Sequence, residues 1–255
     1  MESHGLRDKA LKAIDNTDFY PSKGKERIKS MIETRPDWCV SRQRVWGVPL
    51  PIFISKKTGD VLVDDEVFEN IAKIYEKEGS DCWFNEDYQI FLGDKYKAED
   101  YEKLSDIVEV WFDSGSTHSF VLEKRDDLKW PASMYLEGSD QHRGWFHSSL
   151  LESCGTRGVA PFESILSHGF VVDGKGLKMS KSTGNVIAPQ DILKKYGADI
   201  LRIWVASSNY AEDLRIDYSI LDQHAESYRK IRNTFRYLLG LSLIHISEPT
   251  RPSII

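Results

Sequence analysis

A strand, a polar turn and a helix are encoded in succession by Tyr135-Leu-Glu-Gly-Ser-Asp-Gln-His-Arg-Gly-Trp-Phe-His-Ser-Ser-Leu-Leu151. The stretch begins with a short apolar run, and from Phe146 onward apolar side chains recur on one face of a helix. Gly138 permits a tight exit from the strand, and Ser139 or Asp140 can cap the helix. This order predicts an α/β fold, in which ligands bind at the carboxyl ends of the strands. A solvated loop without a ligand is the alternative.

The composition describes a globular protein with a substantial core. Its 255 residues are 40% hydrophobic and 29% charged, which suffices for one large or two medium domains. A formal net charge of -6 argues against binding nucleic acid by bulk charge, although a local basic patch can still do so.

Neither a membrane span nor a signal peptide is indicated, because no apolar run reaches the ~18 residues of a span and the N-terminus lacks an apolar core. The cysteines Cys39, Cys82 and Cys154 are far apart and form no CxxC pair. This spacing is typical of a reducing compartment and predicts no zinc site. We therefore expect a cytoplasmic protein, with an organellar matrix as the alternative location.

The first hundred residues contain two separate patterns. Residues 24–33 carry apolar side chains at helical spacing and predict an amphipathic helix. Arg42 and Arg44 lie between Trp38 and Trp46, which indicates either a contact surface for phosphate or carboxylate, or arginines that pair with acidic neighbours. After them, a small inserted module is expected, with a hairpin around residues 56–60, a helix over 68–77 and a polar loop over 93–105.

Two further strands are predicted before the glycine-rich loop of the C-terminal half. Residues 107–112 are rich in β-branched and aromatic side chains and run into a hydroxyl-rich turn at residues 113–118. Residues 165–172 predict another strand, interrupted at His168 and Gly169. We expect the polar end of this second strand to form another wall of one pocket.

Residues 173–184 form a loop rich in glycine, lysine and hydroxyl groups. Lys178 and Lys181, three residues apart, suit a polyphosphate, whose charge they can follow as it shifts. A solvated surface loop is the alternative for this pattern alone.

The C-terminal third is predicted to be helical. Pro189 and Gly197 mark the start and the end of one helix, and a second covers residues 199–207. A long helix over 219–239 has apolar residues three and four apart, as in a bundle. Its other face carries basic residues that are either solvated or contact a nucleic-acid backbone, namely Arg229, Lys230, Arg232 and Arg236.

The sequence Lys178-Met-Ser-Lys-Ser182 matches the KMSKS signature of the class I aminoacyl-tRNA synthetases, and Gly184-Asn185 after it fits the same family. The chain resembles this family from about residue 35 to about residue 239. Within the class it is similar to the enzymes for isoleucine. That narrower likeness rests on Ser139-Asp-Gln-His-Arg-Gly-Trp145 and Trp111-Phe-Asp-Ser-Gly115.

The resemblance implies a fold and a division into segments. The expected fold is α/β: the C-terminal half of a Rossmann-like catalytic domain with a small inserted module, followed by the start of an α-helical bundle. The expected segments are the end of an editing-domain insertion or return segment (1–35), an inserted connective module (36–105), the second half of the catalytic domain (106–175), the KMSKS loop with a stem-contact region (176–210), the start of an anticodon-binding bundle (211–241), and an unrelated tail of cloning or adapter origin (242–255).

The resemblance also implies roles for individual residues. Lys178 and Lys181 would be catalytic, with Lys181 on the phosphates of ATP. His168, Gly169 and Met179 would lie near the adenine. The residues implied to bind the aminoacyl-adenylate are Glu137, Gly138, Asp140 and Gln141, together with Trp111 and Trp145 as walls around the isoleucine side chain.

The implied reaction joins L-isoleucine to ATP, giving isoleucyl-AMP and pyrophosphate, and then transfers the isoleucyl group to tRNA(Ile). Magnesium would arrive with ATP as part of the substrate. The HIGH tetrapeptide, the second signature of the class, is absent from the sequence. We therefore expect an internal fragment of a monomeric enzyme, inactive by itself. A synthetase for another branched amino acid, such as valine, and a non-catalytic tRNA-binding fragment are the alternatives.

Overall fold

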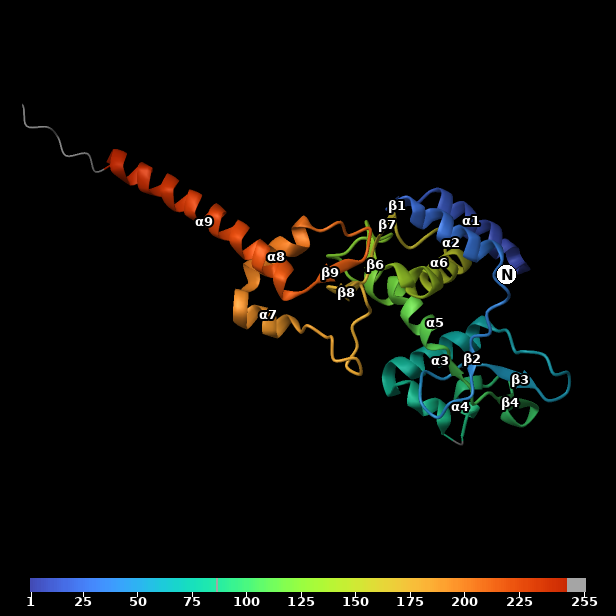
Figure 1. Ribbon diagram of the computed structural model, residues 1–255. Coiled ribbons are helices and arrows are strands. Elements are labelled where there is room, and N and C mark those ends of the chain that lie inside the picture. The colour runs from blue at the N-terminus through green and yellow to red at the C-terminus, as the bar shows by residue number, and fades with distance from the viewer. Residues whose placement is uncertain (86, 247–255) are drawn as a thin grey trace, which may run out of the picture. The chain divides into compact units, whose positions relative to one another are not determined.

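The computed structural model describes residues 1–85 and 87–246 (Figure 1). The chain forms two compact units. Unit 1 comprises Met1–Tyr135 and Asp140–Leu166, and unit 2 comprises Leu136–Ser139 and the chain from Ser167 onward. Residues 247–255, most of the predicted unrelated tail, lie outside the described residues. The six-segment division therefore stays a prediction.

Unit 1 combines α-helices with short strands. Its helices are α1 (Leu6–Asp15), α2 (Lys23–Glu33), α3 (Asp65–Glu78), α4 (Gln89–Leu92), α5 (Val110–Gly115) and α6 (Trp145–Thr156). Its short helical turns include η1 (Ser3–Gly5), η2 (Ser80–Phe84), η3 (Ala98–Asp100) and η4 (His118–Leu122), and η5 (Ser139–Arg143) leads into α6. Its strands are β1 (Asp18–Tyr20), β2 (Ser41–Arg42), β3 (Phe53–Ser55), β4 (Tyr101–Lys103) and β5 (Ile107–Val108).

A three-stranded sheet holds the stretch from Tyr135 to Gly138. Its strand order is β1-β7-β6, where β6 is Tyr135–Gly138 and β7 is Ser164–His168. Strands β1 and β7 run parallel, with Phe19 opposite Ile165. Parallel strands joined through helices confirm the predicted α/β class.

The core of unit 1 lies around α6, which packs against α1 and α5. The predicted apolar face of α6 is confirmed, since Phe146, Leu150 and Cys154 are fully buried. The helix is also buried on its polar face, where Ser149, Ser153 and Glu152 lie. The first helices belong to the same core through residues such as Ile14 of α1, and Ile28 and Ile32 of α2.

The inserted module has a core of its own, built from Phe53, Trp83 and Phe91 with α3. The predicted helix is confirmed as α3, which Asp64 caps by accepting a hydrogen bond from the Glu66 amide. The predicted hairpin is confirmed, since Ile54 and Val61 form an antiparallel bridge and the Ser55 amide donates to the Asp60 carbonyl at 2.9 Å. Strand β3 also pairs with β4, inside the stretch that we expected to be a polar loop. That expectation was wrong because the pairing joins segments far apart in the sequence.

The expected strand over residues 107–112 is also wrong beyond Val108. Strand β5 ends there, and α5 begins at Val110. The switch occurs at Glu109, whose extended backbone and side chain cap the new helix by accepting a hydrogen bond from the Trp111 amide at 3.1 Å. Trp111 and the predicted turn residues Asp113 to Gly115 are therefore helical.

Unit 2 combines a two-stranded parallel sheet with three helices over its described part. Strand β8 (Val171–Asp173) pairs with β9 (Leu214–Ile216), and the helices are α7 (Pro189–Tyr196), α8 (Ala198–Ser207) and α9 (Tyr218–Ile246). Pro189 begins α7 and Gly197 ends it at a φ of 82°, as predicted. Trp204 of α8 and Leu221 of α9 are buried in the core of this unit.

Helix α9 is longer than predicted, and among its side chains up to residue 241 those near its start pack in the core of unit 2. Leu221 is fully buried, but Ile231, Phe235 and Leu238, from the apolar stripe predicted for a bundle, are exposed. Among the described residues, no helix is long and apolar enough to cross a membrane.

Candidate functional site

In unit 1, the start of α6 is organised by Gln141. Its amide oxygen accepts a hydrogen bond from the backbone N–H of Trp145 at 3.0 Å, and its amide nitrogen donates to the Asp140 carboxylate at 3.1 Å. Gln141 thus takes over the capping role that we had expected of Ser139 or Asp140, because η5 separates those residues from the start of α6. The predicted site residues Asp140 and Gln141 lie side by side through this bond.

The indole of Trp145 is fixed on two sides. Its ring is stacked on the phenol ring of Tyr135, with centroids 4.1 Å apart, and its Nε1–H donates to the Ser114 carbonyl at 2.9 Å. A side chain held by both a stack and a hydrogen bond has few rotamers left. The position of this indole is therefore set by β6 and α5 together.

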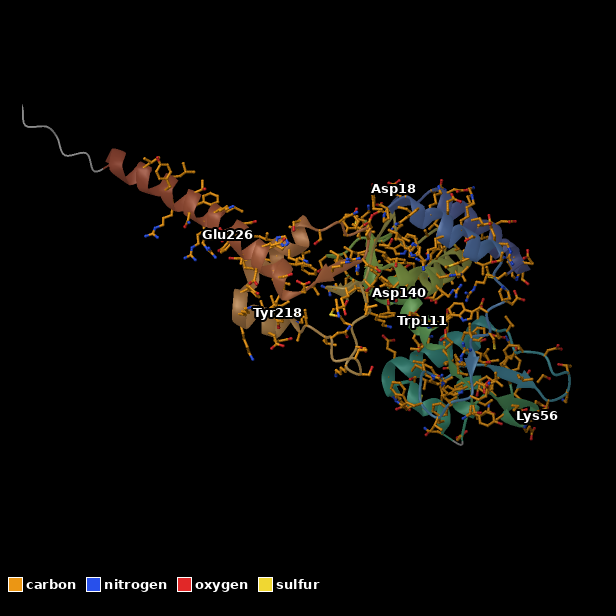
Figure 2. The ribbon with its side chains drawn as sticks, in the orientation of Figure 1. Asp18, Lys56, Trp111, Asp140, Tyr218 and Glu226 are labelled. Atoms are coloured by element: carbon orange, nitrogen blue, oxygen red, sulfur yellow. The ribbon has the colours of Figure 1, made fainter. Side chains whose placement is uncertain are left out.

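The second predicted indole, Trp111, lies against the same turn. A Cβ added to Gly144 would be 2.3 Å from the Gln141 amide oxygen and 3.0 Å from the Trp111 ring, so only glycine allows this approach. Trp111 comes from the first turn of α5 and is 43% exposed, which leaves part of the ring available to a ligand. Figure 2 labels Trp111 and Asp140. The structure thus brings Trp111, Asp140, Gln141 and Trp145 together around Gly144, whose role the sequence reasoning missed.

Close packing of α5 on α6 requires a second glycine. A Cβ on Gly115 would lie 2.1 Å from the Glu152 carboxylate oxygen, and the Gly115 carbonyl accepts hydrogen bonds from Ser149 and His118. Burial, together with the nearby Asp113 and Glu109, raises the pKa of Glu152 to about 8. This buried carboxyl has no signal in the sequence beyond a charged residue on an apolar helix.

The tryptophans and arginines of residues 38–46 had two interpretations, a contact surface or pairing with acidic neighbours, and different residues follow each. Trp38 packs on Phe112, with ring centroids 5.9 Å apart, and Arg42 lies 3.9 Å from the Glu109 carboxylate. These contacts match the alternative in which arginine pairs with an acidic neighbour. Trp46 is 89% exposed and stays a candidate contact residue.

In unit 2, Glu137 and Gly138 lie at the carboxyl end of β6, and Glu137 is exposed. His168 ends β7, and its Nδ1–H donates to the Gly169 carbonyl at 2.8 Å. A Cβ on Gly169 would lie 2.2 Å from the Glu212 carbonyl, so this glycine permits a close backbone crossing. The described geometry thus gives Gly169 a packing role.

Hydrogen bonds of Asp173 and Asn185 hold the base of the lysine loop, which is the loop over residues 173–184. The Asn185 amide donates to the Asp173 carboxylate at 2.8 Å and to the Lys178 carbonyl at 3.2 Å, and its oxygen accepts from the Ser180 amide at 2.9 Å. Hydrogen bonds to Asn185 and to the Leu177 amide lower the pKa of Asp173. The Asp-Gly sequence at residues 173–174 is a turn signal from which the role of Asp173 could have been predicted. Nothing in the sequence around Asn185 predicts that it bridges the two ends of the loop.

The two lysines of this loop are exposed, and the ion pairs of the described residues do not include them. Their ammonium groups are therefore free to meet an anion. Met179 instead packs half-buried against the core of unit 2, a cluster that includes Ile192 and Ile216. Its predicted place near adenine stays a prediction. Over the described residues, no group of three or more His, Cys, Asp or Glu side chains is arranged to hold a metal ion.

A parallel α/β core and an exposed loop of lysines and serines are what the resemblance to the class I aminoacyl-tRNA synthetases predicted. The chain belongs to the family described as tRNA synthetases class I (I, L, M and V), whose model matches residues 1–217.

Relatives within this family are named for isoleucine. The chain is 87% identical over 240 residues to the isoleucine–tRNA ligase of Pelagibacter ubique, covering 94% of this chain and 26% of that protein. It is 58% identical over 235 residues to the isoleucine–tRNA ligase of Zymomonas mobilis, covering 92% and 25%. The chain thus spans about a quarter of the length of the curated relatives it matches.

Solved structures share the fold at low sequence identity. The LeuRS of Agrobacterium radiobacter K84, solved in a ternary complex with tRNA and LeuAMS, matches with a TM-score of 0.57 at 20% identity, over 81% of this chain and 29% of that one. The methionyl-tRNA synthetase of Mycobacterium tuberculosis, solved with methionyl-adenylate, matches with a TM-score of 0.56 at 19% identity, over 86% and 35%. These matches confirm the expected class I catalytic fold.

Proposed function

We propose that this chain works as part of an isoleucine–tRNA ligase, which converts L-isoleucine and ATP to isoleucyl-AMP and then transfers the isoleucyl group to tRNA(Ile). The arrangement of two indoles, Trp111 and Trp145, around the Gly144 turn is the observation that carries this proposal. The high identity to ligases named for isoleucine supports it.

The two indoles suit a branched apolar side chain. Trp145 is rigidly held and Trp111 is partly exposed, so together they offer a preformed apolar wall. Asp140 and Gln141 beside them suit the ammonium group of an amino acid, which only donates hydrogen bonds. Burying one additional CH₂ contributes ~0.8 kcal/mol, so this wall alone would favour isoleucine over valine only about fourfold.

Lys178 and Lys181 would neutralise charge on the phosphates of ATP. Attack of the isoleucine carboxylate on the α-phosphate needs alignment and charge stabilisation more than a side-chain base. Exposed ammonium groups on a loop tied at its base by Asn185 can supply such stabilisation. We assign Glu137, Gly138, His168, Gly169 and Met179 to binding of the adenylate and adenine, and magnesium to the ATP substrate.

Transfer to tRNA(Ile) requires a surface for nucleic acid. The basic residues of α9, Arg229, Lys230, Arg232 and Arg236, are exposed, and Arg229 pairs with Glu226 at 2.7 Å. A row of cations on one helix suits a phosphate backbone, with an affinity that falls as salt rises. A cytoplasmic location and a monomeric state stay predictions.

A chimera tests the proposal. The matching 240-residue segment of the Pelagibacter ubique ligase is replaced by that of this chain, and ATP–pyrophosphate exchange is measured with isoleucine and with valine. We expect exchange that depends on isoleucine, and a Lys181→Ala variant with kcat reduced by about 10²-fold or more. Lys175→Ala, an exposed lysine in the same loop, is the matched control and should leave kcat unchanged.

Absence of isoleucine-dependent exchange in a folded chimera, with the parent ligase active, would contradict the proposal. For the chain by itself we expect no exchange, since its sequence contains no HIGH tetrapeptide. Salt-sensitive tRNA binding by a chimera without exchange activity would instead favour the tRNA-binding alternative.

A further inference from the structure

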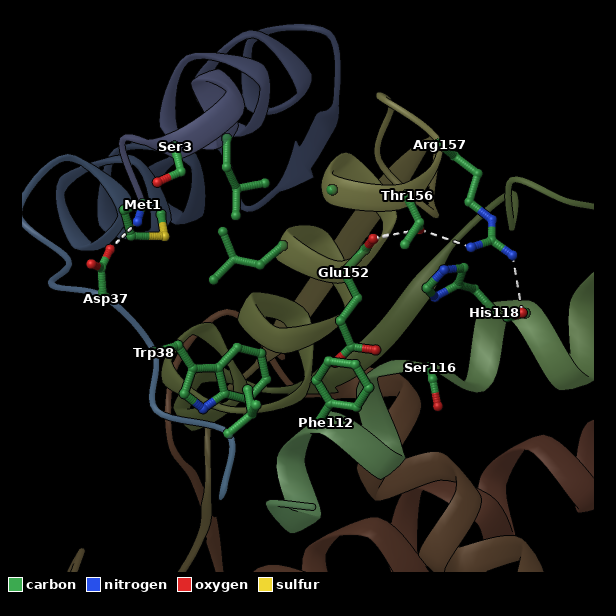
Figure 3. A pocket seen from close by; sticks show the side chains of 15 residues that line it. Met1, Ser3, Asp37, Trp38, Phe112, Ser116, His118, Glu152, Thr156 and Arg157 are labelled. Atoms are coloured by element: carbon green, nitrogen blue, oxygen red, sulfur yellow. Dashed lines mark hydrogen bonds and ion pairs between the residues drawn. The ribbon is translucent and has the colours of Figure 1, made fainter. Parts of the chain in front are cut away.

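Unit 1 contains a cavity of about 650 Å³ that the proposed reaction does not use (Figure 3). Its apolar wall comes from Leu6 of α1, Trp38, Phe112 of α5 and Leu151 of α6. The rings of Trp38 and Phe112 lie 5.9 Å apart at 48°, so two aromatic surfaces face the space. A volume of this size suits a small organic molecule.

Two hydrogen-bond acceptors in the wall of this cavity have no partner. Glu152 is 8% exposed, and its Oε1 accepts no hydrogen bond. Figure 3 shows its carboxylate beside the Phe112 ring. His118 is 1% exposed, and its Nδ1–H donates to the Gly115 carbonyl at 3.0 Å, which leaves Nε2 as an acceptor that is also without a partner. A buried acceptor without a partner is unfavourable, and a ligand with donors would remove that cost.

The strong donor of the same wall is already engaged. Arg157 donates from Nε and Nη2 to both carboxylate oxygens of Glu123, each at 2.8 Å, and Nη2 also donates to the Ser119 hydroxyl at 3.0 Å. The Thr156 hydroxyl donates to the Glu152 backbone carbonyl at 2.6 Å. The free hydrogen-bonding capacity at His118, and at Glu152 when its carboxyl is ionised, is therefore for accepting.

We propose that this cavity binds a primary amine with an aromatic body, whose ammonium group meets Glu152 and His118 and whose ring packs on Trp38 and Phe112. An ammonium group has three donors and no acceptor, so it matches two unpaired acceptors. A free amino acid is disfavoured, because its carboxylate would approach the acidic side chains around Glu152. This inference does not rest on the proposed synthetase function.

The charges around Glu152 favour a cation. The titratable and charged groups that act on it or line the same cavity are Asp113 of α5, Glu109 just before α5, His118 of η4, Arg157 just after α6, and the N-terminal ammonium of Met1, which pairs with Asp37. Arg157 is neutralised by Glu123. Burial and the two acidic neighbours hold the pKa of Glu152 at about 8, so the carboxylate form grows as the pH rises toward 8.5. Amine affinity should rise over the same interval, by roughly eightfold from pH 7 to pH 8.5.

Calorimetric titration of the full chain with tryptamine tests the inference. Its matched probes are 3-methylindole, which lacks the amine, and indole-3-propionate, which carries a carboxylate. We expect binding of tryptamine alone, weakened at least tenfold by Glu152→Gln. Gly155→Met should also abolish binding, because a Cβ at Gly155 meets only the Leu6 side chain, at 3.8 Å, and the remaining side chain can enter the cavity.

Trp111→Ala separates this cavity from the proposed amino-acid site. That variant should bind tryptamine with unchanged affinity, whatever it does to isoleucine activation. Equal binding of 3-methylindole and tryptamine, an unchanged affinity in folded Glu152→Gln, or no binding by the unaltered chain would each overturn the inference.

Discussion

The indole of Trp145 lies flat on the phenol ring of Tyr135, with ring planes 1° apart and centroids 4.1 Å apart. Tyr135 opens β6 and Trp145 opens α6, so the stack joins the two elements that flank the η5 turn. Tyr135 is buried, which raises its pKa to about 12 and keeps it neutral at physiological pH. The stack therefore rests on ring contact.

Removal of the Tyr135 ring should destabilise unit 1. Tyr135→Ala leaves a cavity under Trp145 and should cost about 3–5 kcal/mol of unfolding free energy. Tyr135→Phe retains the ring and should cost less than about 1.5 kcal/mol. Urea unfolding followed by circular dichroism measures both, and equal losses in the two variants would show that the ring contact is not what stabilises the turn.

A methyl group at Gly115 should separate α5 from α6. Gly115→Ala places a Cβ 2.1 Å from the Glu152 carboxylate oxygen and should cost about 1–3 kcal/mol. Gly155→Ala is the matched control on α6, since its Cβ has only a 3.8 Å neighbour. The double variant Gly115→Ala/Glu152→Ala should recover part of the loss, and strict additivity in a double-mutant cycle would contradict this contact.

The stability of unit 1 should fall between mildly acidic and mildly basic pH because of Glu152. Its folded pKa of about 8 lies above the unfolded value of ~4.3, so its contribution is complete below pH ~4 and is lost as the pH rises to about 8. The slope is at most ~1.4 kcal/mol per pH unit. Urea unfolding between pH 6.5 and 8.5 should show this decline in the unaltered chain and not in Glu152→Gln.

His147 also makes the stability of unit 1 depend on pH, but its contribution increases as the pH rises and acts at lower pH. Burial lowers its pKa to about 4, and the nearby Arg35 adds to the shift. Its contribution is present above the unfolded pKa of ~6.5 and is lost as the pH falls toward 4. Because His147 is present in both chains, the difference between their profiles from pH 6.5 to 8.5 isolates Glu152. Parallel profiles for the two chains there would show that Glu152 ionises normally.

Asn185 should control local opening of the lysine loop. Asn185→Ala removes the acceptor of the Ser180 amide and two donated hydrogen bonds, so exchange of the Ser180 N–H should accelerate at least about tenfold. Val186→Ala, an exposed neighbour, is the control. Hydrogen exchange by NMR measures the rate. Equal protection of the Ser180 N–H in both variants would show that Asn185 does not stabilise the base of the loop.

Local signals in the sequence predicted the helices well. The apolar faces of α3 and α6, and the Pro189 and Gly197 boundaries of α7, depend on residues within one or two turns. The strand expected over residues 107–112 failed because β-branched and aromatic residues also form helices when a cap is present, here Glu109. The pairing of β3 with β4 was missed because it depends on distant residues.

The sequence predicted which residues form the candidate site, but not the contacts that hold them in place. The sequence pattern and its family resemblance indicated Trp111, Trp145 and the lysine loop. The Tyr135 stack, the Gly144 approach and the Asn185 bridge arise only when the elements pack. Buried Glu152 had no signal in the sequence, since a glutamate on a helix is usually solvated.

The most direct test of the central claim is the isoleucine dependence of pyrophosphate exchange in the chimera with and without Trp111→Ala. Loss of one apolar wall should raise the KM for isoleucine about tenfold or more, since burial of a large side chain contributes ~1.5–3 kcal/mol. The kcat should change less, because Trp111 contacts no reacting group in the proposed arrangement. An unchanged KM for isoleucine in Trp111→Ala, or a chimera that prefers valine, would contradict the claim that these indoles form the isoleucine site.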